Sequence, residues 1–152
     1  MTSSPHADLE SALDELGRWV KQKKKPTRHH ARAVLIAMGR WIEDDTPAET
    51  DIEALGQRIE TLVAPLGEAW EAAVHDELIL ACTEHVQSVD PRYLDHPRYD
   101  FAYTLAARET LEARLVAATA LDMSPSEELL NKVSRADQVL QPYLDRRGGE
   151  SS

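Results

Sequence analysis

The spacing of apolar side chains constrains this chain more than any other feature. Between Gly67 and Val89 there is no proline, the only glycine is the first residue, and apolar residues recur every three or four positions. That period places them on one face of an α-helix, whereas a half-buried strand would alternate with a period of two. The face comprises Trp70, Val74, Leu78, Ala81, Cys82, Val86 and Val89. Because this segment is the most apolar and lies mid-chain, we expect it to form the central helix.

The same period recurs on both sides of that segment and predicts five further helices. They cover about 7–24, 27–44, 46–64, 98–122 and 124–142. Alanine, leucine, glutamate and arginine are abundant, aromatic residues make up only 5%, and runs of strand-forming residues are missing. We therefore predict an all-α protein with one domain over 1–152, an antiparallel bundle or compact array of about six helices. Residues 1–6 and 146–152 are expected to be frayed tails.

Three helix starts carry capping signals. Thr27 follows the helix-breaking Pro26 and is expected to be an N-cap. The segments 46–49 (TPAE) and 124–127 (SPSE) combine an N-cap hydroxyl, proline at the first helical position and glutamate at the third. They predict that helices open directly after Thr46 and Ser124.

A short phrase occurs twice in the first third of the chain. The segment 13–20 (LDELGRWV) resembles 35–42 (LIAMGRWI), so that each copy has Gly-Arg-Trp within a helix. Since glycine costs a helix about 1 kcal/mol relative to alanine, the phrase indicates close helix–helix approach at Gly17 and Gly39, unless it is a coincidence. Trp19 and Trp41 are our candidates for a partner interface, because tryptophan is frequent in binding hot spots.

Charge is unevenly distributed along the sequence. The formal net charge is -10, yet residues 1–40 hold eight Lys or Arg and only four Asp or Glu, so the remainder carries -14. Such an acidic body excludes a nucleic-acid surface over the whole domain. Cys82 is the only cysteine, and no run approaches the roughly 18 apolar residues of a membrane span. We expect a soluble, cytoplasmic protein without a membrane partner.

The basic corner at 21–32 is the first candidate binding site. Its cations flank a helix N-terminus, where free N–H groups and the helix dipole favour anions. The residues are Lys21, Lys23, Lys24, Lys25, Arg28, His29, His30 and Arg32. An acidic partner, a small phosphate compound or a nucleic-acid backbone would suit it, and a solvated turn without a ligand is the alternative.

The connection at 90–100 is the second candidate, a binding loop. Pro-Arg-Tyr occurs at 91–93 and again at 97–99, and these polar side chains offer directional contacts to a ligand. The candidate residues are Arg92, Tyr93, Asp95, His96, Arg98, Tyr99 and Tyr103. Turn capping and covering of the core edge would also explain them.

No catalytic or metal motif is complete. Cys82 and His85 lie three residues apart on one helix face with Glu71 and His75, but one helix cannot bring all four to one ion. The chain lacks a Gly-rich phosphate loop, His-Glu-x-x-His and Cys-x-x-Cys. We expect no catalytic residue, metal or cofactor.

Our leading hypothesis is therefore a non-catalytic helical interaction or regulatory module whose partner is another protein or a second copy. Binding of nucleic acid or a phosphate anion at 21–32 is the alternative, and a metal-dependent helical-bundle enzyme is the weaker one.

Overall fold

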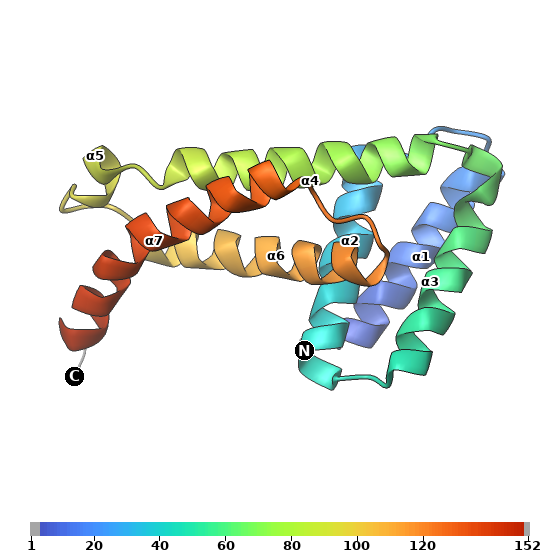
Figure 1. Ribbon diagram of the computed structural model, residues 1–152. Coiled ribbons are helices and arrows are strands. Elements are labelled where there is room, and N and C mark those ends of the chain that lie inside the picture. Colours follow the sequence, from blue (N-terminus) through green and yellow to red (C-terminus); the bar gives the residue numbers. More distant parts are fainter. Residues whose placement is uncertain (1–3, 151–152) are drawn as a thin grey trace.

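The computed structural model describes residues 4–150, and in that range it is all-helical without strands, which confirms the predicted fold class. Figure 1 shows the arrangement. The elements are α1 (Pro5–Lys21), α2 (Arg28–Asp45), α3 (Glu49–Val63), the 3-10 turn η1 (Ala64–Leu66), α4 (Ala69–Ser88), the short α5 (Pro91–Leu94), α6 (Phe101–Ala120) and α7 (Glu127–Glu150).

The helices form two connected groups. α1, α2 and α3 pack together at one end, while α4, α6 and α7 extend away from them towards α5 (Figure 1). The predicted central helix, α4, shares that place with α2, since α4 contacts α2, α6 and α7 while α2 contacts α1, α4 and α6.

Buried side chains follow this division. The main core joins α1, α2, α3, the first half of α4 and the end of α6, and includes Leu16, Leu35, Met38 and Leu78. At the far end a smaller cluster joins α4, α5, α6 and α7 around Phe101 and Leu140. The apolar face predicted for α4 is largely buried, and Cys82 lies within a third cluster between the other two.

The crossing of α2 and α6 explains one of the two repeated glycines. A β-carbon placed on Gly39 would overlap the main-chain atoms of Ala113 in α6, so only glycine permits this distance between the helices. At Gly17 the same β-carbon would meet only the tip of Leu62 at 3.4 Å, an ordinary contact. The predicted close approach is therefore confirmed at Gly39 and wrong at Gly17.

Two of the three predicted helix starts were two residues early. Thr27 directly precedes α2 as predicted, and its main-chain N–H donates to Nδ1 of His30. Thr46 instead ends α2 in a left-handed conformation (φ 42°), and α3 begins at Glu49 after Ala48. Likewise α7 begins at Glu127, where the hydroxyl of Ser126 accepts from the N–H of Leu129. Ser126, two residues nearer α7, therefore takes the capping role predicted for Ser124. Thr46 instead ends α2 where the chain reverses.

Both ends of the described range, 4–150, are more helical than predicted. Ser4 caps α1, which starts at Pro5, and α7 continues through Pro142 to Glu150 instead of stopping there. The carbonyl that loses its helical partner at Pro142 belongs to Gln138, whose residue is exposed to water. The remaining tail residues, 1–3 and 151–152, lie outside the described residues.

No helix in the described range is both long and apolar enough to cross a membrane.

Candidate functional site

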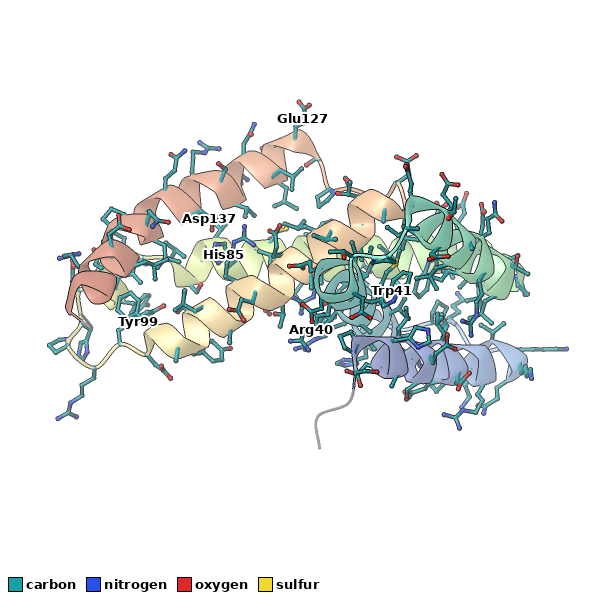
Figure 2. All side chains as sticks on the ribbon, turned by 90° about the horizontal axis from the view of Figure 1, so that it is seen from below. Arg40, Trp41, His85, Tyr99, Glu127 and Asp137 are labelled. Atoms are coloured by element: carbon teal, nitrogen blue, oxygen red, sulfur yellow. The ribbon has the colours of Figure 1, made fainter. Side chains whose placement is uncertain are left out.

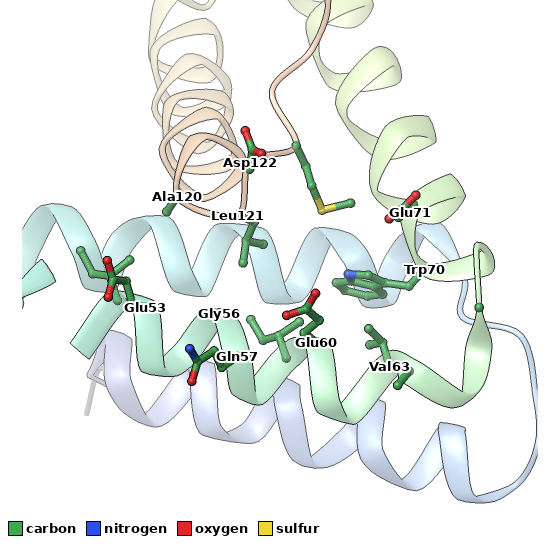
Figure 3. A pocket seen from close by; sticks show the side chains of 15 residues that line it. Glu53, Gly56, Gln57, Glu60, Val63, Trp70, Glu71, Ala120, Leu121 and Asp122 are labelled. Carbon is green, nitrogen blue, oxygen red and sulfur yellow. The ribbon is translucent and has the colours of Figure 1, made fainter. Parts of the chain in front are cut away.

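A broad hollow lies between α3 and the end of α6. Its volume is about 610 Å³, and α3, the turn to α4 and the segment after α6 line it (Figure 3). Its floor is apolar: Ile59, Val63 and Trp70 are almost fully buried there. We call this hollow the acidic groove, for the charges described next.

Only acidic charges surround the floor. Glu53, Glu60, Glu71 and Asp122 are exposed at the groove, and none of its fifteen lining residues is Lys, Arg or His. These carboxylates come from three segments: α3, the start of α4 and the residues after α6. A negative field over an apolar floor favours ligands that combine positive charge with apolar groups.

Local sequence explains the shape of the acidic groove. Gly56 and Ala120 line it and leave space where larger side chains would fill it, and a β-carbon on Gly56 would meet only Leu121, at 3.9 Å. The chain then reverses through η1 and Gly67, whose positive φ of 61° suits glycine. This reversal brings Trp70 of α4 beside Val63, and Leu121 approaches from the other side (Figure 3).

A second hollow, of about 500 Å³, contains part of the basic corner. Arg28, His29 and Arg32 of α2 line it together with Arg114 of α6. From α4 it receives Glu77, Glu84 and His85. We call it the arginine pocket.

The inner wall of the arginine pocket is a buried ion pair. Glu77 and Arg114 are 4% and 6% exposed, and Oε1 of Glu77 lies 3.0 Å from Nε of Arg114. Arg28 approaches the same carboxylate at 3.8 Å. Burial raises the pKa of Glu77 more than the neighbouring arginines lower it, and burial lowers the pKa of Arg114. Both charges are therefore held at a desolvation cost.

The lysines of the basic corner stand apart from the arginine pocket. None of Lys21, Lys23, Lys24 or Lys25 lines it, and all four are exposed. Lys24 stacks its ammonium 4.6 Å from the Trp19 ring, and Trp19 Nε1 donates to the carbonyl of Lys25 at 2.6 Å. The lysine turn is thus fixed against α1, while the arginines face α4 and α6.

Neither tryptophan proposed for an interface is among the exposed large apolar side chains of the described residues. Trp19 also packs 4.7 Å from the ring of His30. Trp41 of α2 is partly buried and packs against the main core, whereas neighbouring Arg40 is exposed (Figure 2). Both indoles therefore have intramolecular roles, and an interface through them stays a prediction.

The predicted binding loop mostly satisfies its own polar groups. Arg92 pairs with Asp90 at 2.8 Å, and the hydroxyl of Tyr143 donates to Asp95 at 2.9 Å. Nδ1 of His96 accepts from the N–H of Arg98. The hydroxyl of Tyr99 shares a hydrogen bond with that of Thr104, and Tyr93 is exposed. Of the seven candidates, only Tyr103 reaches the arginine pocket, on its rim.

His85, which the sequence placed near Cys82, is tied to α7. Its Nε2 lies 2.8 Å from Oδ1 of Asp137, and Arg108 donates to both oxygens of that carboxylate (Figure 2). Cys82 is fully buried, and burial raises the pKa of its thiol. Among the described residues no group of three or more His, Cys, Asp or Glu side chains is placed to hold a metal ion.

The sequence contained a partial signal for the acidic groove that our interpretation missed. Glu53, Gly56 and Glu60 lie on one face of α3 at helical spacing, so a glycine stands between two carboxylates on a polar face. The other half of the groove, from Trp70 and Leu121, depends on chain reversal, and no local pattern indicates it. Comparison with protein-family models, with curated proteins and with solved structures finds no match to this chain.

Proposed function

We propose that this protein is a non-catalytic helical module that binds another protein, and that the partner inserts a basic amphipathic helix into the acidic groove. The observation that carries the proposal is an apolar floor of buried Ile59, Val63 and Trp70 under a rim with only acidic charges. An amphipathic helix laid in a groove supplies apolar anchors at i, i+3, i+4 and i+7.

The spacing of the rim carboxylates on α3 matches the repeat of such a helix. Glu53 and Glu60 are seven residues apart on α3, so they are separated by about 10 Å, or two helical turns. Lysines or arginines at i and i+7 of the partner would face them, while its apolar side chains fill the hollow beside Gly56. Rim ion pairs of this kind contribute about 0.2–1 kcal/mol each, so burial of apolar area supplies most of the affinity and charge supplies orientation.

A second copy of this chain is a poor occupant. Its own basic segment at 21–25 (KQKKK) has no apolar side chain to place on the floor. The partner that we propose is therefore a different protein. Light scattering tests this: self-association of the protein that is abolished by variants of the groove would contradict the proposal.

Three synthetic peptides test the ligand class. The first is an 18-residue Leu/Lys helix with its leucines at i, i+3, i+4 and i+7, the second a scramble of it, and the third an analogue in which Glu replaces Lys. Fluorescence anisotropy of the labelled peptides should give the tightest binding for the first. Binding of the scramble with equal affinity would mean simple charge attraction and would overturn the proposal.

Variants of the protein locate the binding. The double variant Glu53→Lys with Glu60→Lys should lower the affinity for the first peptide by about tenfold or more, equivalent to about 1.4 kcal/mol of binding free energy. Gly56→Leu should weaken it without any change of charge, because the new side chain fills the hollow. Asp76→Lys with Asp14→Lys, two exposed residues outside the groove, changes the net charge by the same amount; this matched control should keep the affinity within about twofold. Equal loss in the control, or none in Gly56→Leu, would place the site elsewhere.

A further inference from the structure

The arginine pocket shares no residue with the acidic groove, and its charges are incompletely matched by the protein itself. Nε of Arg114 is buried and ion-paired with Glu77 at 3.0 Å, but it forms no hydrogen bond of good geometry there, while Nη1 of Arg114 donates to the hydroxyl of Thr110. Nδ1 of His85, in the same pocket, is also buried without a partner. Buried polar atoms are rarely left in this condition.

Arg32 adds a further cation, whose charge acts on Glu77 only at a distance. It is exposed at the pocket, and in the described part of the chain it makes no ion pair or hydrogen bond with another side chain. It is close enough to Arg114 for its charge to lower the pKa of that guanidinium. Two guanidinium groups thus face one hollow next to the N-terminus of α2, which also favours an anion.

The net charge of the residues that line the arginine pocket limits the charge of the anion that it can bind. Arg28, Arg32 and Arg114 oppose Glu77 and Glu84, which leaves a single net positive charge when the histidines are neutral. The lysines that would follow a phosphate backbone lie outside the pocket, and the protein as a whole carries -10. Leu80, Ala81, Ala106 and Ala107 give the pocket an apolar wall.

We propose that the arginine pocket binds a small organic monoanion, a carboxylate on an apolar body, with the carboxylate between Arg32 and Arg114. Planar guanidinium groups match carboxylates in two-pronged hydrogen bonds. The apolar body lies against Leu80 and Ala106. The site is independent of the groove and of its protein partner.

Phenylacetate, phenyl phosphate and the neutral phenylacetamide are the probes, titrated into uniformly ¹⁵N-labelled protein. The Arg114 Nε–H resonance, assigned by triple-resonance NMR on the unmodified protein, reports directly on the buried donor. Phenylacetate should shift it with saturation, and phenylacetamide should not. Equal shifts with the amide, no shift with phenylacetate, or binding of phenyl phosphate more than about tenfold tighter would overturn the assignment.

Arg32→Ala should lower the affinity for phenylacetate by about tenfold or more. Because the Arg32 side chain is exposed, we expect the variant to fold. Arg40→Ala removes an exposed arginine of the same helix that does not line the pocket, and it should leave the affinity within about twofold. The groove variant Glu53→Lys with Glu60→Lys should also retain binding, which separates a failure of this site from a failure of the groove. If Arg40→Ala weakened phenylacetate binding as much as Arg32→Ala, the effect would come from the net charge of the protein and would contradict the proposed site.

Discussion

At the level of single residues, the ion pair of Glu77 and Arg114 ties α4 to α6 inside the protein. Glu77→Gln should destabilise the fold by about 3–5 kcal/mol, because it leaves a buried guanidinium without its carboxylate. Urea denaturation followed by circular dichroism measures this. Replacing both residues by leucine should recover much of the lost stability. A cost below about 1 kcal/mol for Glu77→Gln would contradict the prediction, because it would mean that water solvates the Arg114 guanidinium.

The mid-helix glycines provide a matched set. Gly39→Ala should destabilise by about 2 kcal/mol, since the added methyl group collides with the main chain of Ala113 and α2 and α6 must separate. The methyl group of Gly56→Ala would make only an ordinary contact with Leu121, at 3.9 Å, so this variant should stabilise by up to about 1 kcal/mol through helix propensity. Thermal melts should therefore shift in opposite directions. Equal shifts for the two variants would contradict the close crossing at Gly39.

At the level of elements, α7 is held by the apolar cluster around Leu140 and by the carboxylate of Asp137. Burial alone would raise the pKa of Asp137, but hydrogen bonds from Arg108 and His85 outweigh it and lower that pKa. The stabilisation is therefore complete above the ordinary pKa of about 4 and is lost as the pH falls through the lowered value. We expect the α7 amides to lose protection below about pH 4 while α2 stays protected.

Hydrogen exchange followed by NMR at pH 3 to 7 tests this, with opening free energies corrected for the intrinsic exchange rate. Asp137→Asn is the comparison, and its α7 should open more readily already at pH 7, by about 1–3 kcal/mol for the lost charged hydrogen bonds. An unchanged pH dependence in Asp137→Asn would assign the acid effect to another group.

Pro142 lies within α7 and leaves the Gln138 carbonyl without a helical partner. Pro142→Ala should restore that hydrogen bond and stabilise the second half of α7 by up to about 3 kcal/mol. The same exchange measurement, restricted to amides 139–146, should report slower opening there and no change in α1. Faster opening would mean that the proline ring packs favourably in the native helix.

At the level of the whole molecule, acidic surfaces of two helices meet where α2 crosses α6. Burial first, then the charge of Glu112, raises the pKa of Glu43. The contribution of Glu43 to the free energy of unfolding is complete below about pH 4, where its carboxyl group is neutral. It is lost as the pH rises through the raised pKa. Glu43→Gln should therefore raise the Tm at pH 7 but not at pH 4, and added salt should shrink the difference. A gain at both pH values would point to packing instead of charge.

The helices themselves follow from local sequence. The period of Trp70, Val74 and Leu78 places α4, and Pro26 with Thr27 marks the start of α2, because apolar spacing, prolines and caps act over a few residues. The errors at Thr46 and Ser124 were of two residues, where competing caps or a chain reversal decided the end. At Pro142 tertiary packing around Leu140 and Tyr143 prevailed over the local signal to stop.

The candidate sites were only half visible in the sequence. Arg28 and Arg32 are conspicuous in a basic run, and Glu53, Gly56 and Glu60 share one helix face. Their partners Arg114 and Trp70 are distant in sequence, and the same Gly-Arg-Trp tripeptide has different surroundings at Gly17 and at Gly39. The sequence alone determined an acidic, all-helical chain and most of its helices, because helix formation depends on neighbours along the chain. Only the tertiary structure decided which glycine touches another helix and which charges share a hollow, because those depend on how the helices cross.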